Sequence, residues 1–105
     1  MNPEALFDQL VELFTREDDV DPPGESPGPW DGLALSTAGR VFAVLVSDQL
    51  VVRLTEERVE ALVAAGGALP FTDADQTVPG WAALPLEQNA TWEEHAREAL
   101  ELARG

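Results

Sequence analysis

A run of apolar residues lies in the middle of the chain, at residues 40–46 and 50–54, and both segments are rich in β-branched side chains. Such side chains suit the pleated surface of a sheet. Ser47, Asp48 and Gln49 separate the two segments, a spacing typical of a hairpin loop. The pattern predicts an antiparallel hairpin, and we organise the expected fold around it.

Residues 32–36 are mainly apolar as well, and a short turn at residues 37–39 separates them from the hairpin. They therefore predict the first strand of a three-stranded meander. Residues 40–46 are apolar on both faces, which is unusual for a sheet that is covered on one face only. Either both faces are covered inside the monomer, or one face meets a second subunit. We expect the second arrangement.

Three amphipathic segments predict helices, because apolar residues recur in them every three or four positions behind a capping residue. They are residues 3–15 behind Asn2, the segment that follows Thr55 and ends at Gly66 and Gly67, and residues 92–103 behind a capping box at Thr91. In the last helix, Arg97 is spaced to pair with Glu93 and Glu101 on the outer side.

Two further short segments, residues 68–72 and 81–84, predict edge strands. Pro79 and Pro85 bound the second segment, and proline is tolerated at the edge of a sheet but not at its centre. Residues 17–30 are rich in Pro, Gly and acids and predict a flexible loop. The whole chain, residues 1–105, is expected to be a single α+β domain. Its antiparallel sheet has a central meander over 32–54 and short edge strands, packed with N-terminal, middle and C-terminal helices.

The charge balance is strongly acidic: 20 Asp and Glu residues stand against six basic residues, all of them Arg, for a formal net charge of −14. Such a surface repels nucleic acid and anionic membranes, so neither is an expected partner. The acidity either keeps the protein soluble or serves a function, such as attraction to a basic partner. Without cysteine, a basic leader or a long apolar run, the expected location is the cytoplasm.

Few residues offer chemistry for catalysis, because the chain has one histidine and no cysteine, lysine or tyrosine. His95 lies in the first turn of the last predicted helix and is not accompanied by the local context of a nucleophile. The acids do not follow the spacing of a calcium loop. We therefore expect no catalytic residue, no metal, no cofactor and no enzyme activity.

Short motifs from Gly32 to Trp81 resemble the N-terminal domain of TfoX/Sxy-type proteins, which are related to YjbR/MmcQ-like proteins. The matching segments are Gly32-Leu33-Ala34-Leu35, Gly39-Arg40-Val41-Phe42-Ala43, Leu50-Val51-Val52-Arg53-Leu54, Ala64-Ala65-Gly66, Pro70-Phe71 and Gly80-Trp81. The resemblance implies a small α+β domain with a curved antiparallel sheet and flanking helices, often dimeric. It supplies no catalytic residues.

Two departures from the family pattern remove basic or glycine-rich segments. Pro27-Gly28-Pro29-Trp30 replaces a Met-Phe-Gly-Gly-type entry to the first strand, and Gln76-Thr77-Val78-Pro79 replaces a basic stretch. The full-length TfoX-type proteins are competence regulators and also carry a C-terminal domain, whereas this sequence ends at Gly105 without one. A role in competence is therefore not expected.

Two functional hypotheses remain. The first is a non-enzymatic interaction or regulatory module that forms a homodimer or binds a protein partner through the hairpin, with Phe42, Leu50, Val52 and Arg53 as the candidate interface. The alternative is a small-ligand-binding protein or uncharacterised enzyme. Its candidate pocket lies near Trp30, Trp81 and His95, where aromatic walls meet the single imidazole.

Overall fold

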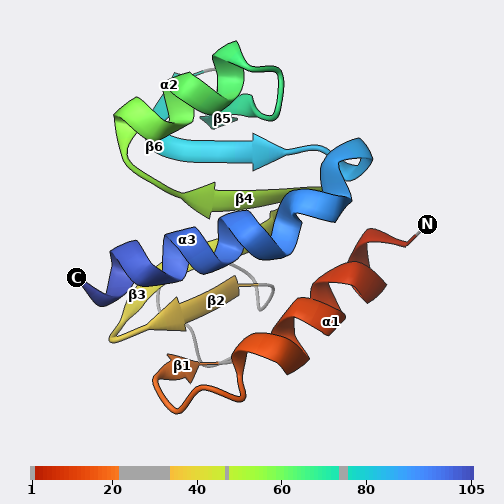
Figure 1. The fold of residues 1–105 in the computed structure, drawn as a ribbon, viewed down its shortest axis with the longest axis vertical. Coiled ribbons are helices and arrows are strands. Elements are labelled where there is room, and N and C mark those ends of the chain that lie inside the picture. Colours follow the sequence, from red (N-terminus) through yellow and green to blue (C-terminus); the bar gives the residue numbers. More distant parts are fainter. Residues whose placement is uncertain (1, 22–33, 47, 74–75) are drawn as a thin grey trace.

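A computed structural model of the chain describes residues 2–21, 34–46, 48–73 and 76–105, and within them it has three α-helices, one 3₁₀-helix and six strands (Figure 1). In chain order these are α1 (Pro3–Phe14), β1 (Val20–Asp21), β2 (Ala34–Thr37), β3 (Arg40–Val46), β4 (Gln49–Arg53), α2 (Glu56–Ala64), β5 (Leu69–Asp73), β6 (Gln76–Leu84), the 3₁₀-helix η1 (Leu86–Thr91) and α3 (Trp92–Arg104). The predicted α+β class is confirmed.

The strands form one antiparallel sheet in the order β1-β2-β3-β4-β6-β5. The meander β2-β3-β4 is confirmed, and the hairpin closes where Val46 pairs with Gln49. β5 lies at one edge, as predicted for residues 68–72. The other edge is the short strand β1, so part of the segment predicted as a loop over 17–30 is a strand. Residues 22–30 of that segment lie outside the described residues.

The edge position predicted for residues 81–84 is wrong. These residues belong to β6, which also includes residues 76–80 and lies between β4 and β5. β4 pairs with β6 only between Leu84 and Trp81, so Pro79 lies past the last paired residue of β4. The missing N–H of this proline therefore interrupts no bond to β4.

Gly80 lies where β6 bends past the end of β4, and its backbone requires glycine. Its φ of +85° lies in the left-handed region that side chains disfavour. The Leu54 N–H donates a 2.7 Å hydrogen bond to the Gly80 carbonyl. A Cβ atom on Gly80 would lie 3.2 Å from the Leu54 carbonyl oxygen. This close approach ties β6 to the junction between β4 and α2.

All three α-helices contribute to one core on the same face of the sheet (Figure 1). α3 crosses β2, β3 and β4, and α2 lies over β5 and β6. Phe14 of α1 meets Phe42 of β3 edge to face, with ring centroids 6.2 Å apart. Burial of these apolar side chains is the main stabilising contribution to the fold.

The other face of the sheet carries a smaller apolar cluster made by Ala34, Val41 and Val44, with Val46 and Trp81 packed against it. Val44 is 3% exposed and Ala34 is fully buried in the single chain. The apolar second face of β3 is therefore covered without a second subunit. Of the two arrangements considered for this face, the one in which it is covered inside the monomer is the one observed.

The helix ends test the capping predictions. The Asn2 side chain accepts a hydrogen bond from the Glu4 N–H, and the Thr55 hydroxyl accepts one from the Arg58 N–H, so both N-caps are confirmed. The predicted capping box at Thr91 is wrong. Its hydroxyl donates instead to the Gln88 carbonyl, because the chain enters α3 directly from η1.

Candidate functional site

The structure places three of the four predicted interface residues in the core. Phe42, Leu50 and Val52 each have an exposed fraction of 0% and pack under the helices. These side chains are not available to a partner in the folded chain, so this part of the prediction is wrong. Arg53 is different, because it is exposed at the end of β4.

The predicted pocket near the tryptophans is not brought together. Trp81 packs with the cluster on the second face of the sheet, whereas His95 lies on α3 above the opposite face. Trp30 lies outside the described residues. The structure therefore places Trp81 and His95 on opposite sides of the sheet, which separates two of the three residues of the predicted pocket.

His95 is buried, with 6% of its surface exposed, and its Nδ1 atom has no hydrogen-bond partner. The closest charged group is Glu98, whose Oε1 lies 3.9 Å from Nδ1. Glu98 is itself held by Arg58 of α2 at 2.9 Å. His95 thus lies beside the ion pair that links α2 to α3, and it lines none of the cavities described below.

The first cavity, which we call the α2–β6 groove, has a volume of about 460 Å³ and runs between α2 and the β5–β6 hairpin. Its walls are mainly apolar and include Val59, Val63, Pro70, Val78 and Trp81. α2 presents Val59 inward because of its helical period, and the strands supply proline and valine side chains. Trp81 thus belongs to a cavity, although not to the predicted one.

The rim of the groove is acidic. Glu56 and Glu60, one turn apart on α2, line it and are exposed, and no basic residue is among its lining residues. The only basic residue of α2, Arg58, is held by Glu98 of α3. An apolar cavity with a negative rim suits an apolar group that is flanked by positive charge.

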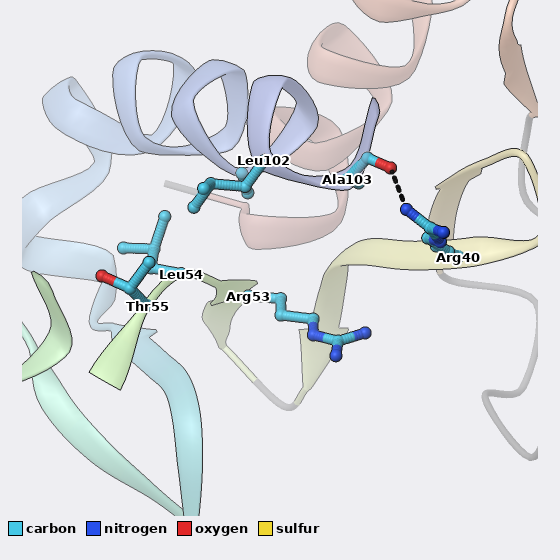
Figure 2. Close-up of a pocket in the computed structure, with 7 residues that line it drawn as sticks. Arg40, Arg53, Leu54, Thr55, Leu102 and Ala103 are labelled. Carbon is cyan, nitrogen blue, oxygen red and sulfur yellow. Dashed lines mark hydrogen bonds between the residues drawn. The ribbon is translucent and has the colours of Figure 1, made fainter. Parts of the chain in front are cut away.

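The second cavity, which we call the arginine pocket, has a volume of about 400 Å³ and has the opposite charge. Its lining residues are Arg40, Arg53, Leu54, Thr55, Ala99, Leu102 and Ala103. Figure 2 shows the two arginine side chains toward one end of the view, with Leu54, Thr55 and Leu102 toward the other. None of the described residues that line it is acidic.

The six arginines all lie among the described residues and divide into two groups by their partners: three pair with carboxylates, and Arg16, Arg40 and Arg53 do not. Arg58, Arg97 and Arg104 pair with carboxylates. Arg40 instead donates to the Ala103 carbonyl at 3.1 Å, at the end of α3. Within the part of the chain that the structure describes, the side chains of Arg53 and Arg16 make no hydrogen bond or ion pair.

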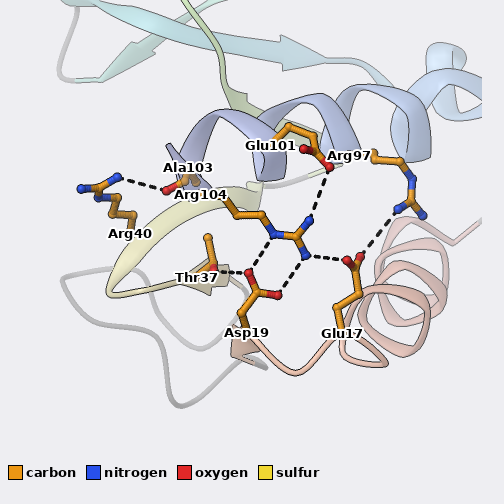
Figure 3. Close-up of polar contacts among 8 residues, drawn as sticks. All are labelled: Glu17, Asp19, Thr37, Arg40, Arg97, Glu101, Ala103 and Arg104. Carbon is orange, nitrogen blue, oxygen red and sulfur yellow. Dashed lines mark hydrogen bonds and ion pairs between the residues drawn. The ribbon is translucent and has the colours of Figure 1, made fainter.

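Arg104 is the centre of an ion-pair network outside both cavities (Figure 3). It holds Asp19 through two bonds of 2.7 and 2.9 Å, and it also contacts Glu17 and Glu101. The hydrogen bond from Arg104 lowers the pKa of Asp19 below its ordinary value of 3.8, against the opposing effect of burial. The same bond raises the pKa of Arg104. The network joins the end of α3 to the segment that follows α1.

The intrahelical pairs predicted for Arg97 with Glu93 and Glu101 are wrong. Arg97 reaches Glu17 instead, at 3.6 Å, and its guanidinium lies 5.1 Å from the centroid of the Phe14 ring. Contact with the aromatic face competes well with an exposed pair along the helix, since such pairs stabilise by only a few tenths of a kcal/mol, about 0.3–0.5.

Among the described residues there is no group of three or more His, Asp or Glu side chains placed to hold a metal ion. In the same residues, no helix is both long enough and apolar enough to cross a membrane. Compared with known proteins, the sequence matches no family model and no curated protein, and the structure matches no solved structure.

Sequence reasoning singled out Arg53 but missed Arg40 and the groove. The sequence did contain a signal for Arg40. Arg40 and Arg53 are the two arginines in predicted strands, away from the helices whose many acids could pair with them. The groove had no such signal. Its walls come from α2, β5 and β6, which the sequence does not place side by side.

Proposed function

We propose that the protein is a non-enzymatic interaction module that holds a short segment of a partner protein in the α2–β6 groove. The observation that carries the proposal is the combination of apolar walls and an acidic rim in one cavity. A volume of about 460 Å³ is in the range of pockets that enclose small ligands. An anchoring apolar side chain of a partner would fill such a space.

The chemistry of the rim defines the partner segment. Glu56 and Glu60 face solvent beside the apolar walls, and Glu57 is exposed on the same helix. A segment with one or two large apolar residues between lysines or arginines complements this arrangement. The net charge of −14 also attracts a basic partner over a longer range and speeds its association.

A peptide titration tests this function. The probe is a capped peptide with Phe-Leu between pairs of lysines, and binding is followed by the amide NMR signals of α2 and β6. We expect Glu60→Gln to weaken binding roughly two- to fivefold, since it removes one rim charge. The matched control is Glu12→Gln, which changes the same charge on an exposed position of α1 outside the groove.

Three outcomes would contradict binding in the α2–β6 groove. One is equal binding of a peptide in which glutamates replace the lysines, because the acidic rim should repel it. The second is an equal loss of affinity in Glu60→Gln and Glu12→Gln, which would reduce the effect to net charge. Shifts that are spread over the whole sheet would also count against a local site.

A homodimer is the second part of the proposal, and the edge strand β5 supports it. An edge strand has unpaired backbone groups that a second copy can bind, and Leu69 on β5 is 50% exposed. Native mass spectrometry measures the mass directly, and a monomer at all accessible concentrations would contradict this part. The resemblance to TfoX/Sxy N-terminal domains and the cytoplasmic location stay predictions from the sequence.

A further inference from the structure

Arg53 lies in the arginine pocket without a carboxylate partner, although acids outnumber basic residues by 20 to 6 in this chain. Three other arginines of the described chain are paired with Asp or Glu, and Arg16, which also has no carboxylate partner among the described residues, lines neither cavity. Arg40, the second cation of the pocket, is bonded only to a backbone carbonyl. The guanidinium groups at this site therefore keep donor capacity that the chain itself does not use.

The rest of the pocket is apolar with one hydroxyl. Leu54 and Ala99 are buried in its wall, and Leu102, which is 45% exposed beside them, leaves apolar surface open to a ligand. Thr55 supplies a hydroxyl that already accepts the N–H of Arg58 and can still donate a hydrogen bond. Cations at one end and apolar carbon at the other make an amphipathic site.

From this combination we infer that the arginine pocket binds a small organic carboxylate that has an apolar tail. The planar guanidinium of Arg53 matches the two oxygens of a carboxylate, and Arg40 adds a second positive charge. The tail lies against Leu54, Ala99 and Leu102. A volume of about 400 Å³ accommodates a ligand of this kind.

The site is independent of the proposed docking function. Its lining residues share none with the α2–β6 groove, and the ligand has the opposite charge to the partner segment. The net charge of −14 disfavours an anion at long range, but at about 0.15 M salt the screening length is roughly 8 Å. Under those conditions the two arginines dominate the potential inside the pocket.

The test is an NMR titration of the full chain with sodium hexanoate at neutral pH and about 0.15 M salt. We expect saturable shifts at Arg53, Leu54 and the end of α3, with a dissociation constant in the millimolar range (about 1–10 mM). Acetate, which lacks the tail, and hexylammonium, which has the wrong charge, should both bind more weakly. Arg53→Gln should weaken hexanoate binding roughly tenfold or more.

Two matched controls make the result specific. Arg16→Gln makes the same charge change at an exposed position that lines neither cavity, and it should leave the affinity within about twofold. Leu102→Ala should reduce the preference for hexanoate over acetate, whereas Leu69→Ala, at the other exposed leucine, should not. NMR spectra of each variant confirm that it remains folded.

Several results would overturn the inference. They are the absence of saturable shifts with hexanoate, equal binding of hexylammonium, and an equal loss in Arg53→Gln and Arg16→Gln. Inorganic phosphate provides a further arm. One outcome is that phosphate binds with the same dependence on Arg53 while hexanoate binds no more tightly than acetate. In that case the pocket is a simple oxyanion site, and the inference that it binds a carboxylate with an apolar tail is wrong.

Discussion

The two cavities meet at the junction between β4 and α2 but have opposite charge. Arg53, Leu54 and Thr55 line the arginine pocket, and the next residue, Glu56, begins the lining of the α2–β6 groove. Within four consecutive residues the chain thus changes from a cationic to an anionic surface. Exposed charges beyond about 8–10 Å are screened at physiological salt, so we expect the nearest charges to decide which ligand each cavity would prefer.

The charges of the two cavities also differ in whether the fold itself explains them. Glu56 lies in the first turn of α2, behind the Thr55 cap, where a negative charge stabilises the helix dipole. The acidic rim therefore has a structural role as well as the binding role that we propose. The Arg53 side chain has no corresponding bond within the described residues, so no contact within them explains its position in the arginine pocket.

The largest expected effect tests whether both cavities depend on one core. Phe42→Ala removes a fully buried ring that packs against Phe14, and should destabilise the fold by about 3–5 kcal/mol. The apparent affinities for the basic peptide and for hexanoate should then fall together, because both ligands bind only the folded chain and its fraction decreases. Urea unfolding measures the loss, and Leu69→Ala, at an exposed site, should stay within about 0.5 kcal/mol. A small loss in Phe42→Ala would contradict the buried position of this ring.

A smaller effect is expected at the contact that joins the two cavities. Gly80→Ala introduces a Cβ atom 3.2 Å from the Leu54 carbonyl and forces alanine to a φ of +85°. We expect a loss of about 1–3 kcal/mol and shifted NMR signals in both cavities, because Gly80 lines the groove and Leu54 the pocket. If the NMR signals shift in only one of the two cavities, the contact between Gly80 and Leu54 does not link them.

The sharpest test of the comparison changes one charge at a time. Arg53→Gln should weaken hexanoate binding and leave the basic peptide unaffected or slightly tighter, and Glu60→Gln should do the reverse. Both positions are exposed, so stability should change by less than about 0.5 kcal/mol. A variant that changes both affinities by the same factor would mean that net charge, not local charge, controls binding.

The smallest effect concerns the Arg104 network, which belongs to neither cavity. Because the pKa of Asp19 is lowered in the folded chain, its ion pair stabilises the fold above its ordinary value of 3.8. This stabilisation is lost as the pH falls below 3.8 through the folded pKa. Asp19→Asn should lower the melting temperature slightly at pH 7. It should have no effect at a pH below the lowered pKa of Asp19, where this side chain is protonated in the folded chain as well. Thermal unfolding against pH measures the difference, and an equal effect at both pH values would contradict the ion pair.

Local signals explain which elements of the fold were predicted correctly. Asn2 and Thr55 were identified as caps because the groups they bond lie within three residues along the chain. The hairpin was predicted because its two apolar segments are separated only by a short loop. In the same way Gly66, at a φ of +81°, ends α2 where only a left-handed residue continues the chain.

Predictions failed where a choice between distant partners decided the outcome. Thr91 bonds back to η1, Arg97 selects Phe14 and Glu17 over its own helix, and β6 inserts beside β4 despite Pro79. The candidate interface failed for a related reason. A strand pattern shows that Phe42 alternates with its neighbours, but not which face the helices cover.

The sequence by itself determined the class of fold, the three helices, the meander and the acidic character, because each depends on periodicity, capping or composition. Only the tertiary structure decided where β6 lies, which face of the sheet is the main core and which arginines remain without carboxylate partners. Both cavities belong to this second group. Their walls come from segments far apart along the chain, and packing of the helices and strands against one another brings those segments together.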